Sequence, residues 1–433
     1  MIPWIRRATI LSPLIIAACA PAAPARPDLD TIATRYVVLA LSMGRHDPAY
    51  VDAYYGPDSL KAQANVEKLS LDAIRAAADS LIAQLGDSVP TYDDSLATMR
   101  HRYLRTQLGS MVARAQMLAG TTLTFDQEAK ALYDATPPHL SDAHFDSLLN
   151  ALDSLVPGRG PLATRYQAFR KRVEIPTTLV DTVFKTAIAA CRERTLAHIT
   201  LPAGETFDLE YVTGTSWNAY NWYKGNSHSL IQVNTDFPIE VDRAIDLACH
   251  EGYPGHHVYN ASLETALVRG RDWVEFSVYP LFSPQSLIAE GSANFGIEMA
   301  FPGDERTAFE HDVLFPLAGL DASLAEQNAK IRAINTELNY ARNEVARQYL
   351  DGGMDSTQAV AAMERYWLQS PAAGAKTLQF IKDYRSYVIN YNLGRDLVAD
   401  WVSREGGTDP AARWRAFASL LASPRLPSDL AAP

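Results

Sequence analysis

The sequence predicts a mainly α-helical protein with one small β-sheet, and three observations support this fold class. From Leu29 to about Leu201, apolar residues recur at helical spacing in segments that end at Gly and Pro turn signals. Beyond Pro202 the pattern changes to short stretches rich in β-forming residues, and from Val241 onward the helical spacing returns. A content of 47% hydrophobic and 21% charged residues in 433 argues for a folded globular chain, against disorder and coiled coil.

The helical pattern of residues 29–201 predicts an N-terminal array of helices. Clear examples are residues 69–85, 95–118 and 179–198. Two strands are predicted at residues 207–213 and 229–235, where β-forming residues alternate with polar ones. The longest later pattern covers residues 320–350. We therefore divide the chain into the helical region 29–201 and a region 202–433 that contains the sheet and the remaining helices.

Residues 1–18 have the organisation of an export signal peptide. Arg6 and Arg7 precede an apolar run that ends just before Cys19. The three residues before Cys19 resemble the bacterial lipobox, in which cleavage leaves a lipidated cysteine at the new N-terminus; a plain signal peptide is the alternative. Residues 19–28 would then form the lipidated end and an Ala- and Pro-rich tether. No later stretch reaches the roughly 18 apolar residues that span a bilayer. We expect a bacterial envelope lipoprotein that faces the periplasm or the cell exterior.

The net charge of the mature chain limits the classes of molecule that it is expected to bind. Loss of residues 1–18 leaves 37 basic and 50 acidic residues, a formal net charge of −13. Such an acidic chain is a poor ligand for nucleic acid or anionic lipid, so its membrane contact is expected through the lipid anchor only.

Two cysteines remain after Cys19, namely Cys191 and Cys249. Export allows a disulfide between them, but both lie in apolar helical contexts where a buried thiol fits equally well.

Residues 250–257 read His-Glu-Gly-Tyr-Pro-Gly-His-His and indicate a metal site, because three of the ten histidines stand beside a glutamate. The string is a loosened form of the His-Glu-x-x-His motif of zinc peptidases, whose two histidines share one helical face. In a regular helix, His256 would lie about 120° from the face of His250, and His257 would lie two turns away. Pro254 and the flanking glycines therefore predict a bulge or break between the histidines.

The eight residues, followed about forty positions later by Glu290-Gly291 in an apolar helix, resemble the domain-of-unknown-function 885 family of gluzincin-like zinc peptidases. Residues 47–57, 233–235 and 387–394 are similar to further segments of that family, so the resemblance covers nearly all of the mature chain. It implies a multi-helical, two-lobed architecture with the small sheet at the active-site cleft, and a bound Zn²⁺.

A catalytic zinc ion usually has three protein ligands and one open position. His250 is the first predicted ligand. For the second, analogy with metallopeptidases whose Gly-His pair follows an expanded spacing favours His256, and His257 remains the alternative. Asp246, one helical turn before His250, is either a hydrogen-bond partner of that ligand or a surface acid. Cys249 is disfavoured as a ligand beside His250, because adjacent helical residues point about 100° apart.

Glu290 is the predicted third ligand. It matches the Glu-Gly position of the family, on a helix whose apolar residues would bury one face. Asn294, one turn later, can accept a hydrogen bond from a ligand imidazole. The rivals are Glu298, about 80° around the same helix, and the acidic cluster at residues 310–312, both of which fit a solvated surface better.

A row of side chains near the C-terminal end is predicted to complete the site. Tyr384, Tyr387, Tyr391 and Arg395 have the spacing of one helical face, provided that Gly394 does not break the helix. We assign Tyr391 to the developing oxyanion, because a phenol can donate to it, and Tyr387 and Arg395 to substrate binding. The alternatives are core packing for the aromatic residues and a surface salt bridge for the arginine.

The strand at residues 229–235 immediately precedes the helix that carries His250. Zinc peptidases of this general type place an edge strand there, and an extended peptide can pair with such a strand through main-chain hydrogen bonds. Asn234 is accordingly assigned to substrate binding. An ordinary structural hairpin is the alternative.

Together these residues predict zinc-dependent hydrolysis of a peptide or small amide. Glu251 would be the general base that takes a proton from the attacking water and passes it to the leaving amine. Two other functions stay open: a zinc hydrolase of a non-peptide amide, such as a cell-wall amide, and an inactive binding or scaffold lipoprotein. The intact Glu251 argues against the last, because a structural metal site needs no free carboxylate there.

Overall fold

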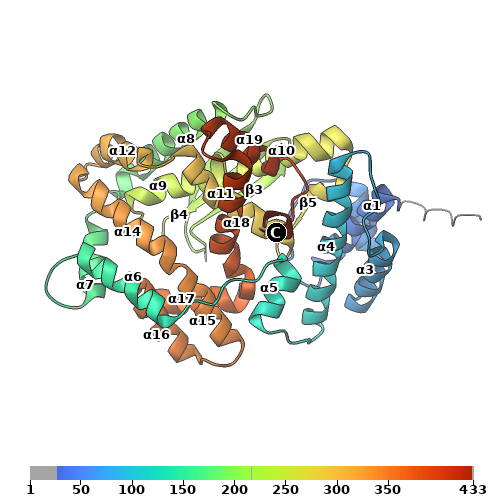
Figure 1. The fold of residues 1–433 in the computed structure, drawn as a ribbon, viewed down its shortest axis with the longest axis horizontal. Helices are drawn as coiled ribbons and strands as arrows, with labels where there is room; N and C mark the ends of the chain where they lie inside the picture. Colours follow the sequence, from blue (N-terminus) through green and yellow to red (C-terminus); the bar gives the residue numbers. More distant parts are fainter. Residues whose placement is uncertain (1–26, 216, 432–433) are drawn as a thin grey trace, which may run out of the picture.

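The computed structural model of the protein describes residues 27–215 and 217–431, and helices dominate it as predicted (Figure 1). The helices before the larger sheet are α1 (Leu29–Met43), α2 (Asp58–Glu67), α3 (Leu71–Leu85), α4 (Ser95–Leu118), α5 (Phe125–Tyr133), α6 (Asp142–Leu155), α7 (Leu162–Lys171) and α8 (Val180–Leu196). Those after it are α9 (Val241–Leu247), α10 (His256–Leu263), α11 (Pro284–Ala300), α12 (Glu305–Phe309), α13 (Phe315–Leu317), α14 (Ala325–Leu338), α15 (Tyr340–Leu350), α16 (Ser356–Trp367), α17 (Pro371–Tyr384), α18 (Ile389–Gly406), α19 (Pro410–Leu421) and α20 (Pro427–Leu430). Short 3₁₀ turns are η1 (Thr177–Leu179), η4 (Val274–Ser277), η6 (Ala322–Leu324) and η7 (Arg385–Val388), and π-helical turns are η2 (Ala248–Gly252), η3 (Glu264–Arg269) and η5 (Glu310–Leu314).

The strongest helical patterns predicted their helices closely. Helix α4 has the predicted bounds, and α3 and α8 differ from theirs by one or two residues at an end. Local hydrogen bonds explain the sharp starts of α3 and α4, because the side chains of Ser70 and Asp94 accept from backbone N–H groups of the first turn. The long pattern at residues 320–350 instead divides into η6, α14 and α15.

The larger sheet has three strands in the order β2 (Thr206–Val212), β4 (His228–Asn234), β3 (Ala219–Gly225). Strand β2 pairs with β4 in parallel and β3 pairs with it antiparallel, so Ser229 has Phe207 on one side and Tyr223 on the other. This corrects two expectations. Strand β3 lies in the segment expected to connect two strands, and the strand expected at the edge is the central one. A peptide cannot pair with β4, because both of its edges are already hydrogen-bonded.

A second sheet joins distant parts of the chain. Strand β1 (Val51–Tyr54) lies within the predicted helical array and pairs antiparallel with β5 (Val278–Pro280). Strand β1 also contacts β3. Just after β1, the ring of Tyr55 meets that of Tyr223 edge to face, with the ring centroids 5.2 Å apart. The segment around residue 52 is thereby held beside the larger sheet.

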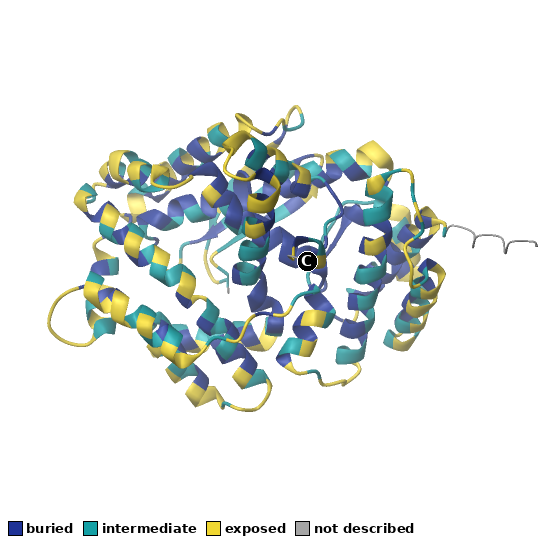
Figure 2. Cartoon of the chain, viewed as in Figure 1, coloured by how far each residue is buried: buried dark blue, intermediate teal, exposed yellow. Residues whose placement is uncertain are grey.

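The described residues form two hydrophobic cores. One gathers α1, α3, α4 and α5 around side chains such as Tyr36 and Phe125, and the other gathers α8, α11 and α19 around Phe184 and Phe417. Buried residues concentrate in the central elements, whereas the outer faces of the peripheral helices are exposed (Figure 2). Each core takes residues from both sides of residue 201, so the predicted division of the chain at that point stays a prediction.

Helices α11 and α18 cross near the middle of the molecule at a pair of glycines (Figure 1). A Cβ atom on Gly291 would lie 2.4 Å from the carbonyl carbon of Gly394, and one on Gly394 would lie 2.7 Å from the carbonyl oxygen of Leu287. Contacts that short do not occur in packed interiors, so both positions require glycine. The close crossing brings Glu290 within hydrogen-bond distance of Tyr387.

The predicted export signal and Cys19 lie outside the described residues, as does most of the predicted tether. Within the described ranges, no helix is long and apolar enough to cross a membrane.

Candidate metal centre

The chain bulges between the first two predicted ligands, as expected from its Pro and Gly residues. Helix α9 passes directly into the π-helical turn η2, and α10 begins at His256. The backbone N–H of Gly255 donates to the carbonyl oxygen of Cys249 at 2.9 Å. A Cβ atom on Gly255 would lie 1.8 Å from the carbonyl oxygen of His250, so only glycine fits. The tight return of the chain brings His250 and His256 together.

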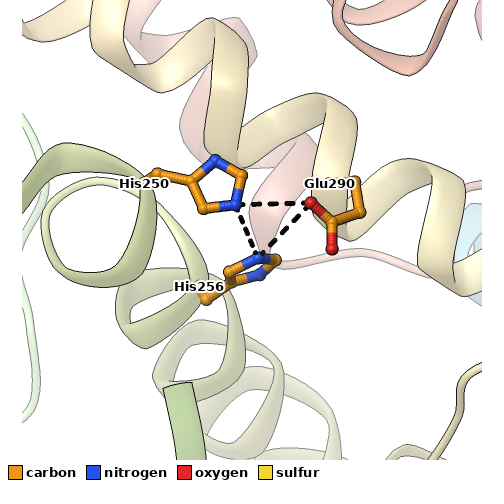
Figure 3. Close-up of side chains that lie close together, drawn as sticks. All are labelled: His250, His256 and Glu290. Carbon is orange, nitrogen blue, oxygen red and sulfur yellow. Dashed lines mark hydrogen bonds and ion pairs between the residues drawn. The ribbon is translucent and has the colours of Figure 1, made fainter. Parts of the chain in front are cut away.

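His250, His256 and Glu290 point toward a common centre (Figure 3) and are called the ligand cluster below. The two Nε2 atoms are 3.1 Å apart, and Glu290 Oε2 lies 3.3 Å from that of His250 and 3.7 Å from that of His256. Ligand atoms about 2.0 to 2.1 Å from a tetrahedral zinc ion are about 3.3 Å from one another. Glu290 Oε2 is buried and has no hydrogen-bond partner among the described residues. The cluster therefore fits a zinc ion, which would also satisfy this oxygen.

Two members of the ligand cluster are oriented by further hydrogen bonds. His250 Nδ1 lies 3.0 Å from Asn294 Oδ1, the contact expected for this amide. The hydroxyl of Tyr387 donates to Glu290 Oε1 at 2.8 Å and so leaves Oε2 directed at the histidines. Such contacts fix the ring and carboxylate orientation of metal ligands. Tyr387, assigned from the sequence to substrate, instead contacts a member of the ligand cluster.

His257, the alternative ligand, points into a separate buried network. Its Nε2 lies 3.0 Å from Glu205 Oε2, and its Nδ1 lies 2.9 Å from the hydroxyl of Ser229. Tyr253 and Arg192 donate to the same carboxylate, each at 2.6 Å. Burial alone would raise the pKa of Glu205, but its hydrogen-bond donors lower that pKa to about 2. These five residues, called the Glu205 network below, anchor the turn that carries the histidines.

A disulfide gives the same turn a second anchor. Cys191 on α8 and Cys249 on η2 are bonded, which settles the pairing that the sequence left open. Cys249 directly precedes His250, so the bond ties the position of His250 to α8. A cysteine in a disulfide has no thiolate to offer a metal ion.

The predicted partner of His250, Asp246, and the rivals of Glu290 are engaged elsewhere in the structure. Asp246 pairs with Arg306 at 2.8 Å instead of contacting His250. Glu298 pairs with Arg395, and the buried Glu310 forms an ion pair with Arg306, with 2.8 Å between Oε1 and Nε. These acids therefore stabilise helix contacts.

Glu251 lies beside the ligand cluster with a free carboxylate. Its backbone carbonyl accepts a hydrogen bond from the Asn221 side chain at 2.7 Å, which fixes η2 against β3. The side chain is only 5% exposed, and its carboxylate makes no hydrogen bond or ion pair with another residue that the structure describes. Burial raises the pKa of Glu251, although His250 and His256 oppose the shift. A raised pKa suits a group that must both accept and release a proton.

The predicted single helical face of tyrosines is interrupted. Helix α17 ends at Tyr384, and Arg385 has a φ of 53°, so η7 and α18 start in a new direction. The rings of Tyr387 and Tyr391 still meet, with centroids 5.8 Å apart. Burial and the nearby Glu290 carboxylate raise the pKa of Tyr391 well above its ordinary value. Its hydroxyl therefore stays protonated, and it has no hydrogen-bond partner among the described residues.

Two side chains assigned from the sequence to substrate binding have partners within the protein. Arg395 donates to Glu298 and to Asp396, in each case at 2.7 Å. Asn234 donates to two carbonyl oxygens of the loop before β3, and its Oδ1 accepts from the backbone of Asp236. These contacts occupy the polar groups that the substrate was expected to use.

Two charged residues at the site were missed from the sequence. Asp52 on β1 accepts a hydrogen bond from Tyr220, and burial raises its pKa to about 7 although His256 opposes the shift. Its segment is one of those that carry the family resemblance, which was the available signal. Arg342 on α15 interacts electrostatically with Tyr391. Nothing in the sequence around Arg342 distinguishes it from other helical arginines.

No family model matches the chain, and no curated protein matches it. Among solved structures, it is similar to a candidate lipoprotein from Colwellia psychrerythraea, with 15% identity over 83% of this chain and 71% of that chain and a TM-score of 0.48. A candidate lipoprotein of unknown function from Shewanella oneidensis has 13% identity over 84% of this chain and 76% of its own, with a TM-score of 0.45. Trypanosoma cruzi metallocarboxypeptidase 1 has 13% identity over 91% and 90%, with a TM-score of 0.45. At such distances the function has to be argued from the residues of this chain.

Proposed function

We propose that the protein is a zinc-dependent metallopeptidase in which His250, His256 and Glu290 hold the ion. The observation that carries this proposal is the triangle of ligand atoms, 3.1 to 3.7 Å on a side, around a buried carboxylate oxygen with no other described partner. Zinc bound there would supply a Lewis acid that polarises a carbonyl group and acidifies water.

Glu251 is the proposed general base. Its free carboxylate accepts a proton from the attacking water, and its raised pKa allows it to give that proton to the leaving amine nitrogen. The contact between Asn221 and the backbone of Glu251 holds the base in place during both transfers. A structural zinc site would enclose the ion with four protein ligands, whereas the ligand cluster has three and a free carboxylate beside it. This arrangement favours a hydrolase over a binding or scaffold protein.

Tyr391 is the proposed donor to the oxyanion. A neutral phenol with an unused hydroxyl can donate to the negative oxygen that develops on the scissile carbonyl, and a preorganised donor of this kind lowers the barrier. The raised pKa of Tyr391 keeps that proton available. We further propose that the enzyme works at the bacterial cell envelope, held by a lipid on Cys19.

Metal content and one substitution test this proposal. Protein purified without chelators should contain about one zinc ion per chain, measured by mass spectrometry of the metal. Glu251→Gln keeps the size of the side chain but cannot accept the proton, so kcat on a peptide library should fall by about 10²- to 10⁴-fold. Its zinc content and unfolding temperature should match those of the wild type.

Glu298→Gln is the matched control, because Glu298 is a half-exposed acid that pairs with Arg395 outside the ligand cluster. It should retain wild-type activity. Zinc-free protein after gentle purification, or full activity in Glu251→Gln, would contradict the proposal. Cleavage of non-peptide amides without cleavage of any peptide would identify the amide hydrolase instead.

A further inference from the structure

Arg342 on α15 is a half-buried guanidinium without a carboxylate partner among the described residues. Its Nε is buried and makes no hydrogen bond there. The ring of Trp367 lies against it, with the centroid 5.3 Å from Arg342 Cζ. Burial lowers the pKa of Arg342, yet a guanidinium remains charged in proteins. A positive charge is therefore partly covered, with an aromatic face as its neighbour.

Several well-covered arginines of the described chain are instead neutralised by carboxylates. Examples are Arg100 with Glu275, Arg114 with Asp47, Arg306 with Asp246 and Arg347 with Asp126. Arg347 is the closest comparison, because it lies on the same helix as Arg342. Covering a charge is costly unless a partner compensates for its lost hydration. Arg342 has no such carboxylate among the residues that the structure describes, so no ion pair accounts for its position.

The position of Arg342 beside the candidate active site is fixed by a reciprocal amide pair. Asn343 Nδ2 donates to Asn392 Oδ1 at 3.0 Å, and Asn392 Nδ2 donates to Asn343 Oδ1 at 3.1 Å. Arg342 and Tyr391 each precede one member of this pair, so α15 and α18 hold them in register. Burial raises the pKa of Tyr391, and Arg342 is a charge that opposes the rise.

The groups around Arg342 are donors without acceptors. The indole Nε1 of Trp367 is buried and has no hydrogen-bond partner among the described residues. The guanidinium and the free hydroxyl of Tyr391 add further donors, and no described carboxylate forms an ion pair with Arg342. Buried donors are normally satisfied, and a carboxylate accepts from guanidinium and neutral N–H groups at once.

We propose that Arg342 binds a carboxylate of the substrate while Glu251 and Tyr391 act on the bond to be cleaved. This inference rests on the proposed peptidase function and names its substrate class. The carboxylate belongs either to a free C-terminus, which makes the enzyme a carboxypeptidase, or to an acidic side chain of a longer peptide. The same guanidinium serves both.

Three N-acetylated peptides that differ only at the C-terminal end separate these sources. The first ends in a free carboxylate, the second in an amide, and the third in an amide after a glutamate. The wild type should prefer the first or the third over the second in kcat/KM. Arg342→Gln should lower kcat/KM for the preferred peptide by about 10- to 150-fold, the loss expected for a hydrogen bond to a charged group, and should hardly change it for the second. Arg342→Lys should restore part of the preference.

Two arginines serve as comparisons. Loss of the carboxylate preference in Arg395→Gln, and not in Arg342→Gln, would return the role to the arginine favoured by the sequence and overturn the inference. Folding is checked by the unfolding midpoint, which Arg342→Gln should leave close to that of the wild type because the guanidinium makes no ion pair with a described residue. Arg347→Gln should lower that midpoint, because it removes the buried charge that pairs with both Asp126 and Glu344.

Binding without turnover distinguishes failure of this inference from failure of the proposed function. In the Glu251→Gln background, calorimetry should show tighter binding of N-acetyl-trialanine than of its amide, and adding Arg342→Gln should remove the difference. Selective binding by a protein that cleaves none of the peptides would keep the role of Arg342 and reject the peptidase. Equal cleavage and equal binding of the acid and the amide, or an equal loss on all peptides in Arg342→Gln, would reject the inference.

Discussion

The ligand cluster and the Glu205 network both contain histidines of the motif at residues 250–257, but the polar groups of the two clusters differ in whether they have partners. In the Glu205 network, both ring nitrogens of His257 have partners and Glu205 receives several donors. In the ligand cluster, two imidazole nitrogens face each other at 3.1 Å and a buried oxygen of Glu290 lacks a described hydrogen-bond donor. Satisfied polar groups hold a fold in one arrangement, whereas unsatisfied ones mark a place for a ligand. The adjacent residues His256 and His257 should therefore respond differently to the same substitution.

His256→Ala should produce the largest effect on zinc. Loss of a residue that merely orients a ligand weakens metal binding by about 10- to 100-fold, so loss of a ligand itself should exceed about 100-fold. Competition with a zinc chelator measures this change. The free energy of unfolding of the metal-free protein should remain close to that of the wild type, because the Glu205 network is intact.

His257→Ala is the matched control one residue later, and the reverse is expected. It leaves Glu205 and Ser229 without their buried partner, so the free energy of unfolding should fall by about 1 to 3 kcal/mol. Chelator competition on the folded fraction should give the wild-type zinc affinity. Equal loss of zinc in both variants would erase the difference between the two clusters.

Glu205→Gln sharpens the comparison through pH. The pKa of Glu205 is about 2 in the folded protein against a usual value of 4.5, so the folded state binds its proton more weakly than the unfolded state. The carboxylate therefore stabilises the fold above about pH 4.5, and this stabilisation disappears as the pH falls toward 2. The neutral variant should lose about 1 to 3 kcal/mol of unfolding free energy at pH 7 and show a smaller further loss on acidification.

Urea unfolding of metal-free protein at neutral and acidic pH measures the effect of Glu205→Gln. Glu210→Gln is the matched control, since Glu210 is an exposed acid on β2, the strand that follows Glu205, and it contacts Gln232. It should change the free energy of unfolding little at either pH. An unaltered pH dependence in Glu205→Gln would mean that the network does not hold its carboxylate in the charged form.

The ligand cluster was largely predictable from the sequence, because metal-binding side chains are chemically distinctive and Pro254 and the glycines encode the break between them. The choice between His256 and His257 was not. A broken helix lets either ring face the metal, and the outcome depends on Glu205 and Ser229, which come from other elements. Local pattern cannot contain that information.

The same limit applies to the sheet and to the substrate side of the site. The pattern of β4 predicted a strand, but its central place follows from pairing with β2 and β3. Arg395 and Arg342 look alike in the sequence, since both lie in helical patterns. They differ only in what the fold sets beside them, which is Glu298 for Arg395 and the ring of Trp367 for Arg342.

Tyr387→Phe should produce the smallest effect, at the contact that joins the tyrosines to the ligand cluster. The substitution removes the hydroxyl that donates to Glu290 at 2.8 Å but keeps the ring against Tyr133 and Tyr391. Zinc affinity should fall by about 10-fold, the lower end of what loss of a ligand's partner costs. Tyr384→Phe is the matched control, because the ring of Tyr384 packs against that of Tyr387, with the centroids 6.0 Å apart, and its hydroxyl does not contact Glu290.

The kinetic pattern of Tyr387→Phe decides between two roles for its hydroxyl. If the hydroxyl only orients Glu290, saturating zinc should restore most of the activity, because the ring packing and the other ligands are unchanged. If it contacts substrate, as the sequence suggested, KM or kcat should stay impaired at every zinc concentration. The second outcome would mean that the Tyr387 hydroxyl binds the substrate, as proposed for the Arg342 guanidinium.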